Sequence, residues 1–209
     1  MPQKIVPLVC DESYHIFNRG VDKRDVFLDK EDYLRFYQSL YLFNTIEPVI
    51  NFDSARVKSK NQVEQETLVE VVAYSLLPNH YHLILKQNFE NGISEFMRRV
   101  STGYTSYFNQ KNERSGSLFQ GRFKRVHINS DALYNYIFAY VNENHFVHDL
   151  SLVREICHSS SLHYQRLATS KLIKASEINQ SYNFSENVSL AQDIYRKRRS
   201  LKADNELLE

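Results

Sequence analysis

The sequence predicts an α+β protein in which an antiparallel sheet carries helices on one face. Two observations lead to this fold. Segments with the period of a strand and segments with the period of a helix follow one another in the order β-α-β-β-α-β, and the two central strands are separated by a two-residue turn. That order is the ferredoxin-like (RRM-like) pattern, to which the chain adds one more helix and a C-terminal extension.

The first strand and the first helix have clear periodic patterns. Residues 13–18 alternate between apolar and polar side chains as a half-buried strand does, and Gly20 ends the segment. From 30 to 43 the apolar side chains recur at helical spacing. The polar stretch 53–65 has no such period, so we predict a connection there.

The two central strands form a predicted hairpin. Residues 68–77 are rich in β-branched side chains, which favour a strand. Pro78 and Asn79 are turn residues, and residues 80–85 form the next strand. The two strands should therefore pair in antiparallel orientation.

The second half of the predicted core contains a helix, a strand and a last helix. Apolar residues lie on one face of a helix at 93–108, a loop at 109–121 holds two glycines, and 122–128 returns as a strand. Asp131 can cap the last helix, which we expect to run to about His145.

Length and composition indicate one domain with an appendage. A chain of 209 residues can bury one sizeable core. We predict a domain over 1–165 and a C-terminal helical extension over 166–209. The chain shows no apolar run of signal-peptide or membrane-spanning type, so we expect a cytoplasmic protein with no membrane partner. Cys10 and Cys157 lack the spacing of a zinc site.

The charge is distributed unevenly although the net charge is only +1. Between residues 98 and 125 the chain carries seven basic residues against one acid, and five aromatic residues are interleaved with them. Cations that meet phosphates, together with rings that stack on bases, suit a single-strand binder. A solvated helix face followed by a basic loop would give the same pattern, so both interpretations stay open.

A pair of histidines is a candidate metal site. His80 and His82 are two residues apart in a predicted strand, so both side chains leave the same face of the sheet and can bind one ion. Two histidines on an exposed sheet face would look the same. The pair also needs a third ligand.

The last predicted helix offers that ligand and a nucleophile. Tyr136, Tyr140 and Asn144 follow at intervals of four, so they share one stripe of the helix. Tyr140 is the better nucleophile of the two tyrosines, because Asn144, a hard oxygen ligand, follows it one turn later. Tyrosines on helices are more often core residues, and this chain has 14 of them.

Four ordered motifs resemble one family. LLPNHYHLIL at 76–85 resembles the HUH motif of the single-tyrosine transposases that mobilise insertion sequences through single-stranded DNA. GSLFQGRFKR at 116–125 is similar to a signature of the REP-associated tyrosine transposases. YHIFNRG at 14–20 is similar to their opening strand, and YNYIFAYVNEN at 134–144 to their catalytic helix.

This resemblance implies a metal-dependent enzyme that nicks and rejoins single-stranded DNA. His80, His82 and Asn144 would hold Mg²⁺ or Mn²⁺. Tyr140 would attack the phosphodiester and form a 5′-phosphotyrosine intermediate. The family usually has proline after its asparagine, whereas His145 follows here.

The resemblance also implies the partner, which is single-stranded or hairpin DNA at DNA ends or repeats. Nucleoid association follows from that partner, and family members occur as monomers and as homodimers. We expect five residues of the basic stretch to contact DNA: Arg114, Phe119, Arg122, Lys124 and Arg125.

Two other functions stay open. A catalytically idle nucleic-acid-binding regulator of the same fold would bind the same DNA without cutting it. A metal-dependent hydrolase would use water as its nucleophile and would release product without a covalent intermediate.

Overall fold

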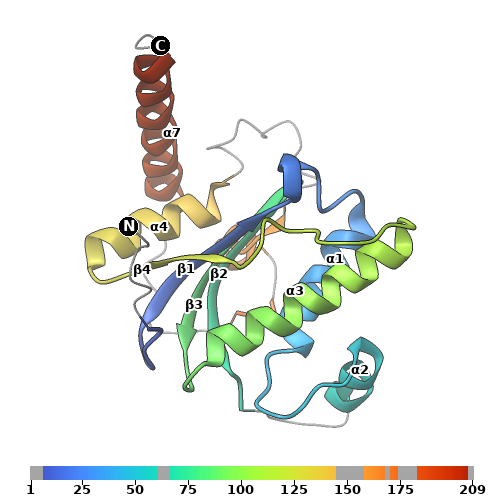
Figure 1. Ribbon diagram of the computed structural model, residues 1–209. Coiled ribbons are helices and arrows are strands. Elements are labelled where there is room, and N and C mark those ends of the chain that lie inside the picture. Colours follow the sequence, from blue (N-terminus) through green and yellow to red (C-terminus); the bar gives the residue numbers. More distant parts are fainter. Residues whose placement is uncertain (1–6, 61–65, 145–157, 168–169, 174–182, 207–209) are drawn as a thin grey trace.

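A five-stranded antiparallel sheet forms the centre of the molecule, with strand order β4-β1-β3-β2-β5 (Figure 1). The computed structural model describes residues 7–60, 66–144, 158–167, 170–173 and 183–206. The strands are β1 (Ser13–Arg19), β2 (Val69–Leu77), β3 (His80–Gln87), β4 (Lys124–His127) and β5 (His158–Ser159). The first four have the ferredoxin-like order, so the predicted fold is confirmed.

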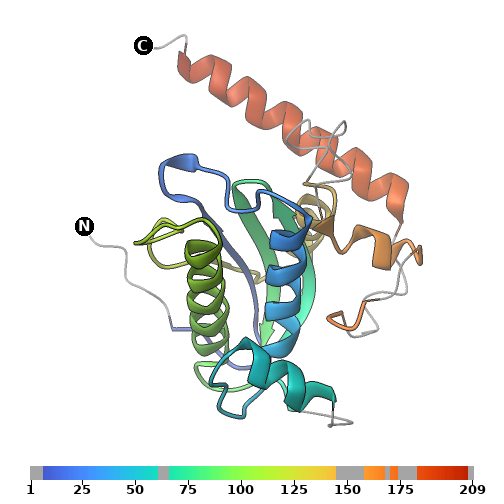
Figure 2. The same cartoon turned by 90° about the vertical axis from the view of Figure 1, so that its right-hand side faces the viewer.

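Helices lie on both faces of this sheet. They are α1 (Lys30–Leu42), α2 (Phe52–Lys60), α3 (Gly92–Lys111), α4 (Asp131–Asn142), α6 (Ser161–Tyr164) and α7 (Phe184–Glu206), with a 3-10 turn η1 (Val21–Lys23). Figure 2 shows α1 and α3 side by side against one face. The α4 helix contacts β2 and β3 from the opposite face. None of the described helices is long and apolar enough to cross a membrane.

The register of β1 against β3 decides which side chains meet which helices. Ile16 lies opposite Leu83 and both are fully buried. Tyr81, on the same face as Leu83, packs against Phe36 of α1 with ring centroids 5.2 Å apart. The neighbouring positions of both strands therefore point the other way, towards α4.

The turn before β3 is tied to the segment that follows β1. The carbonyl of Pro78 accepts hydrogen bonds from the N–H groups of Val26 and Phe27, at 2.7 and 3.0 Å. The N–H of Gly20 donates to the carbonyl of Asn79 at 2.9 Å. A Cβ atom at Gly20 would lie 2.3 Å from a backbone oxygen of Arg24, so only glycine fits there.

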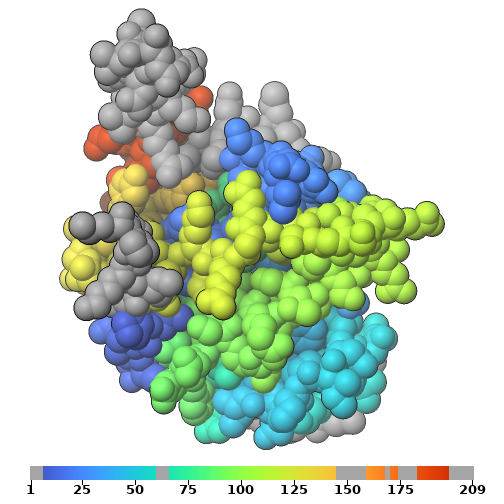
Figure 3. All heavy atoms as spheres, viewed as in Figure 1, coloured from blue at the N-terminus to red at the C-terminus, as the bar shows by residue number. Residues whose placement is uncertain are grey.

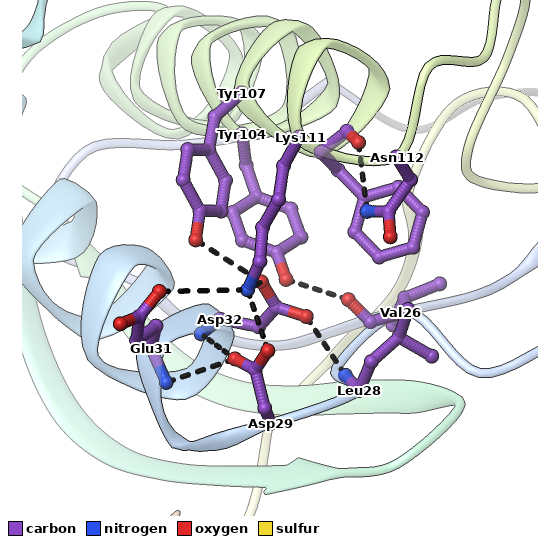
Figure 4. Close-up of polar contacts among 10 residues, drawn as sticks. Val26, Leu28, Asp29, Glu31, Asp32, Tyr104, Tyr107, Lys111 and Asn112 are labelled. Atoms are coloured by element: carbon purple, nitrogen blue, oxygen red, sulfur yellow. Dashed lines mark hydrogen bonds and ion pairs between the residues drawn. The ribbon is translucent and has the colours of Figure 1, made fainter.

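An ion cluster joins the start of α1 to the end of α3 (Figure 4). The fully buried carboxylate of Asp32 accepts from the N–H of Leu28 at 2.8 Å and from the Lys111 Nζ at 2.9 Å. Asp29 contacts the same Nζ at 2.6 Å. Desolvation alone would lower the pKa of Lys111, but hydrogen bonds to Asp29 and Asp32 raise it above its ordinary value. The lysine therefore stays charged and neutralises a buried carboxylate.

The structure differs from the predicted elements in four places. The connection after residue 50 contains α2, because Phe52 is buried there and the Arg35 guanidinium stacks on its ring at 3.4 Å. The fourth strand is shorter than predicted and begins at Lys124. The last core helix ends at Asn142, not near His145, and the short strand β5 was not predicted.

The C-terminal segments pack on the core. Leu172 and Ile173 are buried, and Ile173 bridges to Val71 of β2. Ala191 and Ile194 of α7 are buried as well, and α7 contacts α4. The domain boundary after residue 165 stays a prediction. Buried apolar residues lie on both sides of it.

Replacing Lys111 by methionine should destabilise the fold. Asp32 would keep its other hydrogen bonds but lose its cation inside the core. We expect the free energy of unfolding to fall by about 2 kcal/mol, less than the about 3–5 kcal/mol of a fully buried pair, since part of the lysine is exposed. Urea denaturation measures this change. The exposed Lys30→Met is the control, with an expected change under about 0.5 kcal/mol, and an equally small effect of Lys111→Met would contradict the prediction.

Candidate active site

The face of the sheet that α4 covers gathers three aromatic side chains with reactive atoms. The ring centroid of Tyr140, on α4, lies 5.1 Å from that of His82 on β3 and 6.1 Å from that of His15 on β1. The His15 and His82 rings stack 5.1 Å apart. All three residues are nearly buried. The structure therefore brings a candidate nucleophile next to one of the predicted metal ligands.

His80 lies at the beginning of β3, beside His82. The two ring centroids are 5.1 Å apart, as expected for residues on one face of a strand. The Nδ1 atom of His80 lies 2.5 Å from Oδ1 of Asn79. Because that oxygen only accepts, Nδ1 carries the hydrogen, and Nε2 is the basic nitrogen that can bind a metal.

His15 contacts His82 through a buried hydrogen bond. Its Nε2 atom lies 2.8 Å from Nδ1 of His82. One hydrogen lies between the two nitrogens. If His82 is to bind a metal through Nε2, its Nδ1 must donate and His15 must accept. His15 can thus fix the tautomer of His82, with the Phe17 ring stacked on His82 at 5.7 Å.

The two tyrosines of the predicted stripe have different environments. The ring of Tyr140 is 6% exposed and faces the sheet, whereas Tyr136 is 40% exposed. Ser130, and not the predicted Asp131, caps α4 by accepting a hydrogen bond from the N–H of Leu133. Ile137 and Val141 are buried, and they fix the rotation of the helix on the sheet. Tyr140 is therefore held in the site, and Tyr136 is not.

Asn144 lies just beyond the end of α4. The preceding two side chains tie the helix end to the segment after β5: Ser160 donates to Asn142 at 2.6 Å and Ser161 donates to Glu143 at 2.7 Å. Asn144 itself is fully buried, and neither polar atom of its side chain has a hydrogen-bond partner among the described residues. A buried amide without a partner is costly unless something else binds it.

The predicted metal ligands have donor atoms of the types that bind divalent cations. The candidate set consists of the imidazoles of His80 and His82 and the amide oxygen of Asn144. The amide oxygen is a donor type that suits Mg²⁺ and Mn²⁺, and imidazole is a ligand of divalent transition metals. The buried, unsatisfied amide of Asn144 is the observation that favours a ligand here. Among the described residues, no three His, Cys, Asp or Glu side chains are grouped as a metal site by themselves.

The basic residues predicted to contact DNA lie on and next to the edge strand β4. Arg122 and Lys124 are exposed and Arg125 is half-buried. Lys124 lies opposite Phe17 of β1, on the face of His82, whereas Arg125 lies opposite Ile16, on the face of α3. The basic edge therefore presents cations to both sides of the sheet.

Arg114 and Phe119, unlike the exposed cations, contact other parts of the protein. Arg114 donates to Oδ1 of Asn109 at 2.5 Å and to the carbonyl of Ser117 at 3.0 Å. The ring of Phe119 is 5% exposed and packs on Tyr81 with centroids 5.5 Å apart. Both residues hold the loop in place, so in this conformation the Phe119 ring does not offer a face to a base.

Sequence reasoning missed His15 and Phe17 as parts of the site. The signal was present, because both lie on one face of the alternating segment 13–18. The register of β1 against β3 brings both residues beside His82. His15 and His82, which contact each other through a hydrogen bond, are 67 positions apart in the chain. Strand periodicity alone does not provide that register.

Comparison with known proteins agrees with this architecture. Residues 51–144 match the model of a family described as "Transposase IS200 like". A solved structure of a REP-associated tyrosine transposase bound to a REP hairpin has the same fold, with a TM-score of 0.57 and 14% sequence identity. That alignment covers 88% of this chain and 96% of the other. No protein of curated function matches this sequence.

Proposed function

This chain belongs, through residues 51–144, to the IS200-like transposase family, and we propose that it nicks and rejoins single-stranded DNA through Tyr140. The resemblance indicated by the four motifs is thereby confirmed at the level of the family. One observation carries the proposal. The phenol ring of Tyr140 lies 5.1 Å from the imidazole of His82, on the sheet face that also bears His80.

The chemistry is a phosphoryl transfer to tyrosine. The phenol oxygen of Tyr140 forms a bond to the scissile phosphorus, and the bond from phosphorus to the 3′-oxygen breaks. The phenol loses its proton to solvent, and the departing 3′-oxygen takes one up to become a hydroxyl. The product is a 5′-phosphotyrosine. Because the ester bond is conserved, a 3′-hydroxyl can reverse the step and rejoin DNA.

His80, His82 and Asn144 would hold the divalent cation, Mg²⁺ or Mn²⁺. When bound, such an ion polarises the scissile phosphate as a Lewis acid. His15 would support this role by accepting a hydrogen bond from Nδ1 of His82, which leaves Nε2 as the basic nitrogen. The burial of this pair restricts the ring of His82 to one orientation.

The DNA substrate we propose is a hairpin with unpaired flanking bases, at DNA ends or repeats. The related protein of known structure is bound to a REP hairpin. In this chain Arg122, Lys124 and Arg125 would contact phosphates, which positions the strand without specifying its sequence. Arg114 and Phe119 would serve DNA binding by seating the loop that carries these cations.

Three broader proposals complete this function. The chain acts in the cytoplasm, in association with the nucleoid, because its substrate is there. It works as a monomer or a homodimer. The transposase domain spans residues 1–165, and residues 166–209 form an extension that supports α4 through the buried Ala191 and Ile194 of α7.

Tyr140→Phe should abolish covalent attachment to DNA because it removes the nucleophilic oxygen and keeps the ring. The measurement is a denaturing gel of protein incubated with labelled hairpin DNA and Mn²⁺, scored for a protein–DNA band. The exposed Tyr136→Phe on the same helix is the matched control and should keep the band. A wild-type protein that binds this DNA without any covalent band would instead indicate an idle binding module, and release of cut product without the band would indicate a hydrolase.

His15→Leu should weaken Mn²⁺ binding by roughly 10- to 100-fold, the usual cost of losing a residue that orients a metal-bound histidine. His15→Gln should restore most of the affinity, since its amide oxygen can accept the same hydrogen bond. Calorimetric titration of the DNA-free protein measures both. The control is His127→Gln, at the partly exposed histidine stacked on Tyr14 at the other face of the sheet. Equal Mn²⁺ affinity in all three variants would rule out the orienting role of His15.

Arg122→Ala should weaken DNA binding and lower the slope of log affinity against log salt by roughly 0.7 to 0.9, the release of about one counterion. Fluorescence anisotropy at several salt concentrations gives that slope. Arg56→Ala on α2 removes the same charge from an exposed position outside the basic edge and should leave the slope unchanged. An unchanged slope in Arg122→Ala would exclude this residue from the DNA contact.

A further inference from the structure

The last turn of α4 is tied to the edge of the sheet by one buried serine. Ser160 follows the short strand β5, and its hydroxyl accepts a hydrogen bond from the N–H of Tyr74 on β2 at 3.0 Å. The N–H of Ser160 donates to the carbonyl of Tyr74 at 2.9 Å. The same hydroxyl donates to Oδ1 of Asn142, the last residue of α4, at 2.6 Å. Ser160 therefore extends the pairing of β5 with β2 by one residue and holds the end of α4 at the same time.

The side chain of Asn142 is bound at both of its polar atoms. Its amide nitrogen donates to the carbonyl of Phe138 at 3.1 Å, while its oxygen accepts from Ser160. Asn142 and Ser160 are fully buried, so water does not compete for these groups. Breaking such a hydrogen bond leaves a buried polar atom without a partner, which is costly. The end of α4 is therefore fixed in direction as well as in distance from β2.

This anchor connects two parts of the proposed cation site. The next residue of β2, Ser75, pairs with His82 of β3 on one side and with β5 on the other. At the other end of the anchor, Asn144 follows Asn142 by two residues. A continuous series of backbone and buried hydrogen bonds thus leads from His82 through Ser160 to Asn144. Ligands of one ion must be held at defined positions, and residues around them provide that support.

The remaining supports of the α4 end are weaker in direction or farther from β2. Glu143, which caps α4, accepts a hydrogen bond from Ser161 at 2.7 Å, and Gln165 donates to the same serine at 2.7 Å. The α7 helix lies next to α4 (Figure 3) and buries Ala191 and Ile194. Apolar packing of this kind has no preferred direction. Among the described residues, Ser160 alone joins an α4 side chain to the β2 backbone through hydrogen bonds of its own side chain.

We propose that Ser160 is a positioning residue for the cation site. Through Asn142 it sets the amide oxygen of Asn144 at the distance from His80 and His82 that one divalent cation needs. The inference rests on the proposed function, in which these three residues bind the cation, and it adds a residue to that site. Ser160 lies beyond the last of the four sequence motifs.

Ser160→Ala tests the proposal, because it removes the hydroxyl and keeps the backbone hydrogen bond to Tyr74. We expect roughly tenfold weaker Mn²⁺ binding by the DNA-free protein, the lower end of the range for residues that orient metal ligands. Calorimetric titration measures the affinity. The matched control is Ser39→Ala, which removes another fully buried hydroxyl, hydrogen-bonded to the carbonyl of Arg35 on α1 at 2.8 Å. Its Mn²⁺ affinity should change by less than about twofold, since it lies in a separate network.

A second variant tests the route through Asn142. Asn142→Ala should weaken Mn²⁺ binding as much as Ser160→Ala, and the double variant should be no weaker than either single one, because both remove the same hydrogen bond. Circular dichroism and thermal unfolding verify that each variant is folded. If Ser160→Ala is not, Asn142→Ala replaces it, since the Ser160 hydroxyl can then donate to the carbonyl of Tyr74, 3.3 Å away.

A purely structural role for Ser160 would lower thermal stability and leave the Mn²⁺ affinity of the folded protein as it is. Equal Mn²⁺ affinity in Ser160→Ala and Ser39→Ala would therefore overturn the proposal. Losses that multiply in the double variant would overturn it too, and so would a wild-type protein that binds no Mn²⁺.

The covalent band of the wild-type protein separates this inference from the proposed function. A band in wild type together with undiminished Mn²⁺ binding by Ser160→Ala would refute the positioning role and leave the nickase intact. Weakened Mn²⁺ binding by Ser160→Ala, in a protein that forms no band as wild type, would support the positioning role and reject the nickase.

Discussion

The antiparallel pairing of β1 with β3 is the constraint on which the rest of the molecule depends. With Phe17 opposite His82, the histidines of β3 face α4 while Tyr81 and Leu83 enter the core beneath α1 and α3. Strand side chains alternate with a period of two, so a slip of one residue would exchange the two faces. The face that bears the proposed metal ligands and the hydrophobic core are therefore specified by the same register.

At the turn that precedes His80, hydrogen bonds from other segments add to the pairing of the strands. The turn at Pro78 and Asn79 receives hydrogen bonds from the segment that begins at Gly20, and the N–H of Val21 donates to the carbonyl of Leu118 at 3.0 Å. Three motifs that are far apart in sequence thus meet immediately before His80. Position 20 lies so close to Arg24 that a Cβ atom there would clash with its backbone oxygen. The proposed ligand His80 follows directly after this tied turn, which holds it in a defined position.

The two faces of the sheet carry different parts of the molecule. Tyr140, His82 and their neighbours occupy one face, while α1 and α3 cover the other. The edge strand β4 contributes to both faces, since Lys124 and Arg125 leave it in opposite directions. The ion cluster around Lys111 holds α1 and α3 together.

The sequence by itself determined the order of the elements, the central hairpin and the pairing of His80 with His82 on one face, because these features follow from local periodicity and turn chemistry. Only the tertiary structure decided that His15 joins the site, that α4 ends at Asn142 and that Phe119 is buried. The physical reason is distance along the chain. Strand register, helix ends fixed by remote side chains, and burial all arise from contacts between segments that no local pattern connects.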